Sequence, residues 1–290
     1  MDQFLNVTWS GIWIGCEYAV IGVALVLNFR AGRVVNLAVG EVFVFAFLLA
    51  AWLQEGGLSP LLAMLAAVVV GAALTGGQDY LLLQRLRRST SATLLLATLG
   101  VSTLLSGIAV VVFGRDPTSG EGIVRDGTVV FGPVRTNWPT IVFVAAVVAL
   151  IMFAWWSTSK TETGRAMAAA GHDAGAAAML GINVPRLRLM ATAGSGAMLG
   201  ITGALFLPLG VLDFSLGLRL TLFGFVAAAL AGYESVPGAL IGGWTFGIVD
   251  ALGTTYVSST FGLFFTFSAL IVIALATQRI RTDREVFDSV

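Results

Sequence analysis

Charged residues are scarce in this sequence. Lysine, arginine, aspartate and glutamate together make up only 11% of the 290 residues, whereas apolar residues make up 57% and the mean hydropathy is +0.92. Soluble domains carry about 25% charged residues, so the composition excludes an ordinary soluble protein and predicts an integral membrane protein. Sixteen basic residues balance sixteen acidic ones, and this lack of net positive charge argues against nucleic acid as a partner.

Cysteine and histidine are nearly absent. The single cysteine, Cys16, lies within an apolar run, so a disulfide framework and a cysteine-based metal site are both excluded. The single histidine, His172, has no second histidine or cysteine with which to hold a metal. The sequence also lacks the G-x-x-x-x-G-K-[ST] phosphate-binding loop, so we expect that the chain itself does not hydrolyse ATP. Because no hydrolytic or redox constellation is present either, we expect a protein that is not an enzyme.

Long apolar runs dominate the sequence instead. A transmembrane helix needs about 20 consecutive apolar residues, and a shorter run, 220–233, fits either a tilted short span or a broken helix. The N-terminus MDQFLNVTWSG lacks the basic region of a cleavable signal, so we expect the first run to be retained. We predict one all-α, polytopic membrane domain, 1–290, with eight or nine transmembrane helices. The runs of spanning length are 9–29, 34–53, 60–83, 92–113, 138–157, 189–212, 236–257 and 260–278.

Basic residues between the runs orient the chain in the membrane. With the N-terminus outside and nine spans, twelve basic residues fall inside and four fall outside, which is the bias expected of cytoplasmic loops. The segment 158–188 and the C-terminal tail then lie in the cytoplasm. Eight spans would put the tail and the early loops on opposite sides, so the bias favours nine. The four outside basic residues are Arg115, Arg125, Arg135 and Arg219.

Glycines recur at a four-residue spacing in several runs. Such pairs let helices approach closely in lipid, where apolar side chains give no net attraction, so we predict a tightly packed bundle. The longest outside loop, 114–137, contains GTVVFGPV, which predicts a short hairpin. The loop fits a docking rim for an external partner and a plain solvated connector equally well. The glycine pairs are Gly11 and Gly15, Gly196 and Gly200, Gly238 and Gly242, and Gly243 and Gly247.

Few ionisable residues lie within the runs. A charged residue at the centre of a membrane helix costs about 2.5–3.5 kcal/mol, so each fits either a polar substrate path or a structural hydrogen bond between helices. Glu41 is the strongest candidate for the path, because Asn36 and Gly40 make the stretch VVNLAVGE polar and easily broken. Asn36 and Glu41 are about 140° apart on an ideal helix, so only a kink or an unwound turn near Gly40 brings them together. The other ionisable residues are Glu17, Asp250 and, near a helix end, Asp79.

Hydroxyl groups recur every four residues in the run 92–113. Thr98, Ser102 and Ser106 therefore lie on one face of the predicted helix. They fit a polar strip that lines a pore, or hydroxyls that bond the carbonyl one turn earlier on their own helix. Both alternatives stay open. The candidate residues of a substrate pathway are Asn36, Glu41, Thr98, Ser102 and Asp250.

The cytoplasmic segment 158–188 is typical of two short helices. Thr161 or Thr163 is placed to cap the first helix, Gly171 to interrupt it and Gly181 to end the second. AMAAA and AGAAAML are strong helix formers with small side chains, which fit a groove on a partner protein. The alternative, a helix resting on lipid headgroups, is disfavoured because the segment lacks bulky apolar anchors.

Five stretches of the sequence carry a family resemblance that runs nearly end to end. They are GCEYAVIGVALVLNF, AGRVVNLAVGE, LLLATLGVSTLLSGIAVVVFG, TGRAMAAAGHDAGAAAMLGINVPRLR followed by GITGALFLPLGVLD, and AALAGYESVPGALIGGWTFGIVDAL. In this order they resemble the permease subunits of branched-chain (hydrophobic) amino-acid ABC importers, particularly the shorter Liv-type permease. The sequence departs from that family at Val39, where a histidine is common, and at LAGYES, which replaces a Gly-rich stretch.

The resemblance implies a division of labour among several chains. Two homologous permeases form the path, two cytoplasmic ATPases bind ATP and Mg and engage a coupling helix, and an extracytoplasmic solute-binding protein delivers the cargo. It implies a bacterial cytoplasmic (inner or plasma) membrane and a branched-chain or other hydrophobic amino acid as cargo, although related permeases carry urea, short amides or other small metabolites. It places Asn36 and Glu41 in the polar motif of the second span. The residues that it assigns to the coupling element are Gly164, Arg165, Ala166, Asp173, Ala177, Gly181 and Ile182.

An ion-coupled secondary transporter or channel is the alternative from another class. It would use Glu17, Glu41 and Asp250 as ion or proton sites. The segment 158–188 favours the importer, because a secondary transporter has no need of such a cytoplasmic insert.

Overall fold

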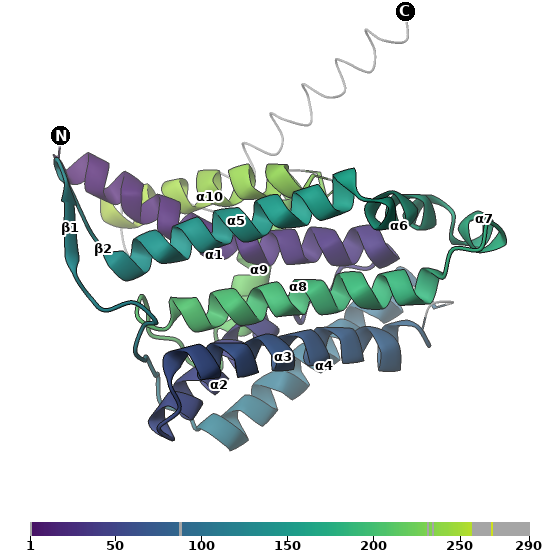
Figure 1. Cartoon of the computed structure of the whole chain (residues 1–290), viewed down its shortest axis with the longest axis horizontal. Helices are drawn as coiled ribbons and strands as arrows, with labels where there is room; N and C mark the ends of the chain where they lie inside the picture. Colours follow the sequence, from purple (N-terminus) through teal and green to yellow (C-terminus); the bar gives the residue numbers. More distant parts are fainter. Residues whose placement is uncertain (1, 87–88, 231, 234, 257–267, 269–290) are drawn as a thin grey trace, which may run out of the picture.

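The computed structural model describes residues 2–86, 89–230, 232–233, 235–256 and 268. Within these residues the chain is mostly helical (Figure 1), as predicted. Six of the described helices are long and apolar enough to cross a membrane. The predicted run 260–278 and the C-terminal tail lie outside the described residues, apart from residue 268.

The helices form one bundle, and a two-stranded antiparallel hairpin precedes α5. The hairpin pairs Thr128 with Asn137 and Phe131 with Val134, which confirms the prediction from GTVVFGPV. The elements are α1 (Asp2–Gly32), α2 (Val39–Glu55), α3 (Pro60–Gln78) with a π-helical turn (Asp79–Leu83), α4 (Ser91–Phe113), β1 (Thr128–Phe131), β2 (Val134–Asn137), α5 (Trp138–Lys160), α6 (Glu162–His172), α7 (Ala174–Met179), α8 (Val184–Phe206), α9 (Gly217–Leu230) and α10 (Val236–Tyr256).

Two of the apolar runs differ from the predicted helices. In the run 34–53, residues 34–38 are not helical and α2 begins only at Val39. The run 189–212 is helical only to Phe206, at the end of α8. The residues that follow α8 return along the bundle to α9, which has 14 residues and is therefore shorter than the six long helices. The predicted short run 220–233 thus corresponds to a short helix.

Glycine surfaces hold two pairs of helices together, α1 against α10 and α3 against α8. A Cβ on Gly15 of α1 would lie 2.6 Å from the carbonyl oxygen of Gly243 on α10. A Cβ on Gly200 of α8 would lie 2.6 Å from the Cα of Val68 on α3. Because no larger residue fits at these positions, the predicted packing role is confirmed for the pairs Gly11 and Gly15, Gly196 and Gly200, and Gly243 and Gly247. The glycines at the two contacts are Gly11, Gly15, Gly71, Gly196, Gly200, Gly243 and Gly247.

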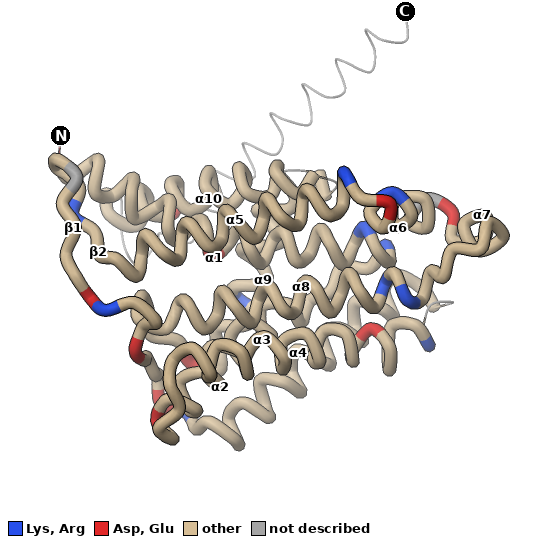
Figure 2. Tube along the Cα trace, in the orientation of Figure 1, with Lys and Arg blue, Asp and Glu red and all other residues tan. Residues whose placement is uncertain are grey.

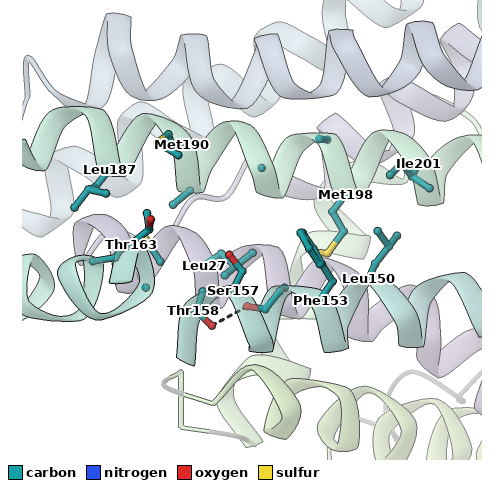
Figure 3. A pocket seen from close by; sticks show the side chains of 16 residues that line it. Leu27, Leu150, Phe153, Ser157, Thr158, Thr163, Leu187, Met190, Met198 and Ile201 are labelled. Atoms are coloured by element: carbon teal, nitrogen blue, oxygen red, sulfur yellow. Dashed lines mark hydrogen bonds between the residues drawn. The ribbon is translucent and has the colours of Figure 1, made fainter. Parts of the chain in front are cut away.

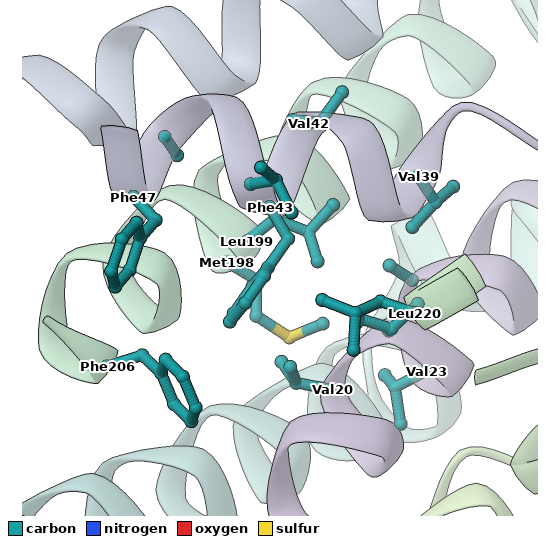
Figure 4. Close-up of a cluster of buried hydrophobic side chains, with 14 of the residues drawn as sticks. Val20, Val23, Val39, Val42, Phe43, Phe47, Met198, Leu199, Phe206 and Leu220 are labelled. Carbon is teal, nitrogen blue, oxygen red and sulfur yellow. The ribbon is translucent and has the colours of Figure 1, made fainter. Parts of the chain in front are cut away.

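Apolar side chains of α1, α2, α8 and α9 fill the centre of the bundle (Figure 4). The ring of Phe206, the last residue of α8, lies 5.9 Å from Phe43 and 6.2 Å from Phe47, both on α2, and 5.6 Å from Phe143 on α5. In the apolar part of α1, 78% of the residues are buried, compared with 22% in α4. The first helix is therefore central in the bundle, and α4 lies at its periphery.

The two ends of the bundle differ in charge. The N-terminus and the hairpin lie at one end, and α6 and α7 lie at the other (Figure 1). Lysine and arginine gather at the end with α6 and α7, whereas the middle of the bundle carries few charges (Figure 2). This arrangement places the segment 158–188 at the basic end, as the loop charges predicted.

We expect Gly15→Val to destabilise the bundle by about 1–3 kcal/mol, because the added side chain would overlap the backbone of α10. The measurement is thermal unfolding of the detergent-solubilised protein. Gly77→Val serves as the control, since a Cβ on Gly77 would meet nothing within 4 Å. Equal melting temperatures for the two variants would contradict the close packing of α1 on α10.

Candidate functional site

The start of α2 lies inside the bundle and is stabilised by side chains. The Oδ1 atom of Asn36 accepts a hydrogen bond from the N–H of Ala38 at 3.0 Å. The hydroxyl of Thr221 on α9 accepts a bond from the N–H of Gly40 at 2.9 Å and also reaches the carbonyl of Leu37 at 3.2 Å. Buried backbone groups at a helix end must be satisfied in this way. The helix is therefore interrupted just before Val39, close to Gly40, but the interruption does not align Asn36 with Glu41.

Glu41 joins three helices at this break. Its side chain is buried, and its Oε1 atom accepts a hydrogen bond from the hydroxyl of Ser102 on α4 at 3.2 Å. Its carboxylate also contacts Gly217, the first residue of α9, and receives a backbone hydrogen bond from Leu218. The N-terminus of a helix carries partial positive charge, which favours a carboxylate at this position. Since Ser102 is the middle residue of α4, the buried acid lies deep within the bundle.

The three hydroxyls of α4 face the bundle, but each bonds a protein group. Thr98 donates to the carbonyl of Leu95 at 2.9 Å, and Ser106 donates to the carbonyl of Phe214 at 3.2 Å. Ser102 is the hydroxyl of the stripe that reaches an acidic side chain. Among the described residues, Thr98 makes the bond within α4 that the spacing allowed, and Ser102 makes a polar contact between helices. That the stripe lines a pore stays a prediction.

Asn36 and Glu41 do not share a partner. The side-chain amide of Asn36 exchanges two hydrogen bonds, each 3.0 Å long, with the amide of Gln78 at the end of α3. Glu41 points instead toward α4 and α9. The sequence reasoning missed Gln78, since an uncharged amide at a helix end carries no signal in a hydropathy pattern.

A buried ion pair lies close to this amide pair. Asp79, the residue that follows Gln78, pairs with Arg188 on α8 at 3.0 Å, and both side chains are at most 5% exposed. Gln84 donates to the other carboxylate oxygen at 3.0 Å. The prediction that Arg188 is a cytoplasmic loop charge is therefore wrong. The side chain of Arg188 points into the bundle because it neutralises the buried carboxylate of Asp79. A buried charge is stable only beside a partner of opposite charge.

A second polar group surrounds the middle of α1. The hydroxyl of Tyr18 donates to Asp250 on α10 at 3.1 Å, and Glu17, the middle residue of α1, interacts electrostatically with Arg219. The guanidinium of Arg219 lies 5.2 Å from the ring of Phe223, which in turn packs on Tyr18. Asp250 therefore belongs to this group around α1.

Arg219 was expected in an outside loop, and that expectation is wrong. It is the third residue of α9 and lies beside Glu17, halfway along the longest helix. Its side chain is nevertheless exposed on the surface of the chain. The sequence reasoning missed this position because the return of the chain between α8 and α9 leaves no clear mark in the hydropathy.

The segment 158–188 forms two capped helices, as predicted, but the break comes two residues later than expected. The hydroxyl of Thr161 accepts the N–H of Gly164 at 3.1 Å at the start of α6. Asp173, not Gly171, separates α6 from α7 and accepts the N–H of Gly175 at 2.8 Å. Gly171 is small for another reason, since a Cβ there would lie 2.7 Å from the carbonyl of Arg30 at the end of α1.

The predicted coupling residues divide into exposed and buried ones. Arg165, Asp173 and Gly181 are exposed, and Gly181 ends the segment at φ +82°. Gly164 and Ala177 are buried, and Ala177 packs in an apolar cluster with Ala170 and Val184. The remaining two, Ala166 and Ile182, are half-buried.

Two large apolar side chains project from the end of α7. Met179 is 85% exposed and Leu180 is 81% exposed. The expectation that this segment lacks bulky apolar anchors is therefore wrong. We call Met179 and Leu180 the apolar tip. These residues lie directly at the end of α7, and α7 lies at the basic end of the bundle beyond the long helices (Figure 1).

Residues 9–275 match the family described as branched-chain amino acid transport system / permease component. The chain belongs to this family. LivH of Salmonella typhimurium, a high-affinity branched-chain amino acid transport system permease protein, is 28% identical, with 94% of this chain and 93% of LivH covered. BraD of Pseudomonas aeruginosa is 27% identical over 94% of each chain, and a probable LivH of Methanocaldococcus jannaschii is 28% identical over 88% of this chain and 84% of that protein.

Family membership agrees with the resemblance found in the sequence. The family comprises transport permeases and not enzymes. The helices long and apolar enough to cross a membrane, together with the bacterial membrane permeases among the relatives, place the chain in a bacterial inner membrane.

We expect Arg188→Met to destabilise the protein by about 3–5 kcal/mol, because it leaves the carboxylate of Asp79 buried without its cation. The double variant Asp79→Leu with Arg188→Met should recover most of this loss, since it removes both charges together. Thermal unfolding of the three proteins in detergent measures both effects. A double variant no more stable than the single one would contradict the pairing.

Proposed function

We propose that this chain forms half of the solute path of an ABC importer for branched-chain or other small hydrophobic amino acids. The family match and the relatives LivH and BraD, whose names refer to branched-chain amino acid transport, support the type of cargo. The observation that carries the mechanism is the apolar tip, which the fold holds beyond the basic end of the bundle. An exposed pair of large apolar residues on a rigid support favours an interface with another protein.

The proposed assembly contains two homologous permeases, two cytoplasmic ATPases and an extracytoplasmic solute-binding protein. The chain is proposed to act as one transmembrane domain, 1–290, with nine spans, and with 158–188 as the cytoplasmic coupling segment. The basic residues near α6 and α7 support this orientation. ATP and Mg bind to the partner ATPases, and their closure moves α6 and α7, which are joined directly to α5 and α8.

The proposed solute path passes the start of α9. Arg219 is exposed although it lies beside the middle of α1, and a charge at that depth requires water or a partner around it. Arg219 and the acidic residue Asp250 offer opposite charges on either side of Tyr18 and Phe223. An amino acid carries both a carboxylate and an ammonium group, so this arrangement suits it. In this proposal, Glu41 and Ser102 hold the start of α9 in position from the side of α2 and α4.

Leu180→Asp should prevent the partner ATPases from binding, because it places a charge in the proposed apolar contact. The measurement is co-purification of the ATPases with a tagged permease from membranes. Leu58→Asp is the control, since Leu58 is also exposed but lies in the short connection between α2 and α3. Normal ATPase recovery with Leu180→Asp would contradict the proposed contact.

Arg219→Gln should reduce uptake of labelled leucine by about 10- to 100-fold, because a hydrogen bond to a charged group contributes about 1.5–3 kcal/mol. The assembled complex should still form, since Arg219 does not contact the apolar tip. Uptake is measured in vesicles with ATP inside, and it should be blocked by vanadate but not by an ionophore. Uptake by the variant at the wild-type rate would contradict a role of Arg219 in the solute path. Uptake that an ionophore blocks would contradict the proposal that the chain belongs to an ATP-driven importer.

A further inference from the structure

An apolar groove lies between α5 and α8, and residues of α6 line one end of it (Figure 3). It encloses a cavity of about 320 Å³, and its floor includes Leu27 of the central helix α1. Phe153 and Met190, which line it from α5 and α8, are 63% and 54% exposed. Because both helices are long and apolar enough to cross a membrane, the groove opens where hydrocarbon chains surround the protein.

A second cavity continues the groove toward the basic end of the bundle. It measures about 340 Å³ and shares Thr163, Leu187 and Met190 with the first cavity. Its lining adds two exposed charged residues, Glu162 at the start of α6 and Arg186 in the first turn of α8. Neither of them forms an ion pair with another described residue. The groove is thus apolar inside and carries one charge of each sign at its mouth.

We propose that this groove is a binding site for a single zwitterionic phospholipid of the phosphatidylethanolamine type. One acyl chain fills the apolar cavity, the phosphate lies at Arg186 and the ammonium group lies at Glu162. An anionic headgroup without an amine would satisfy Arg186 but would leave the carboxylate of Glu162 beside a like charge. The two charges at the mouth therefore favour ethanolamine over glycerol as the headgroup.

The bound chain contacts the underside of α6. Thr163, Gly164 and Met167 of α6 form the roof of the groove, so an occupied groove supports α6 from below. A Cβ on Gly164 would lie 2.5 Å from the carbonyl oxygen of Ser157, which shows how closely α6 already approaches α5. If the proposed function holds, the lipid supports the element through which the ATPases act. Lipid binding itself does not depend on that function.

Gly194→Leu tests the acyl-chain part of the proposal. Gly194 lines the groove, and a Cβ there would meet nothing within 4 Å, so we expect a leucine side chain to extend into the groove. The full-length variant should retain the melting temperature of the wild type and lose most of the phosphatidylethanolamine that co-purifies in mild detergent, measured by mass spectrometry. Gly77→Leu adds the same side chain on α3, where a Cβ also meets nothing within 4 Å, and this variant should retain all of its phosphatidylethanolamine. Equal lipid retention by the two variants would overturn the proposal.

Headgroup selectivity provides a second, independent test. The delipidated wild-type protein, offered equal amounts of phosphatidylethanolamine and phosphatidylglycerol, should bind phosphatidylethanolamine preferentially. Glu162→Gln should abolish this preference, and Arg186→Gln should weaken binding of both lipids. Both residues are exposed, so neither change disturbs the core. A wild-type protein without preference would overturn the assignment of the headgroup. The test uses the permease alone and requires neither the ATPases nor transport. A negative result would therefore contradict the lipid site without contradicting the proposed importer.

Discussion

The internal start of α9 depends on one constraint, which is that every backbone group freed inside an apolar bundle must find a partner. Both α2 and α9 begin within the bundle, where protein groups bond N–H groups of their first turns. The hydroxyl of Thr221 accepts a hydrogen bond from the N–H of Gly40 at the start of α2. The carboxylate of Glu41 accepts one from the backbone of Leu218 at the start of α9. Each broken helix thus supplies the group that the other one needs. This mutual satisfaction lets the chain place a helix end, with its partial positive charge, in the middle of a membrane domain.

Much of the fold could be predicted from the sequence because its determinants are local. The apolar runs set the helices, GTVVFGPV sets the hairpin, and Thr161 and Gly181 set the ends of the segment that contains α6 and α7. The remainder depends on contacts between distant residues. Arg188 was counted as a loop charge because Asp79, which draws it inward, lies 109 residues earlier in the chain. Arg219 was placed outside because nothing local shows that the chain returns into the bundle after α8. The exposure of the apolar tip likewise follows only from how α7 is held.

Rigid helices join the proposed solute path to the proposed coupling segment. The segment of α6 and α7 is joined directly to α5 and α8, and α8 packs on α3 through glycine surfaces that allow no gap. Close packing of this kind transmits a displacement rather than absorbing it. In the proposed importer, a push on the apolar tip would therefore move α8, and with it the residues that lead from Phe206 to the start of α9. The buried pair of Asp79 and Arg188 links the π-helical turn after α3 to α8.

Accessibility of the start of α9 to water tests the account most directly. In a Cys16→Ser background, Leu218→Cys places a thiol beside Arg219, and Val69→Cys places one at an exposed position in the middle of α3. In the assembled transporter, a charged thiol reagent that does not cross membranes should modify the first variant and not the second, at a rate that changes when the ATPases bind nucleotide. Equal inertness of the two thiols would contradict a solute path at the start of α9.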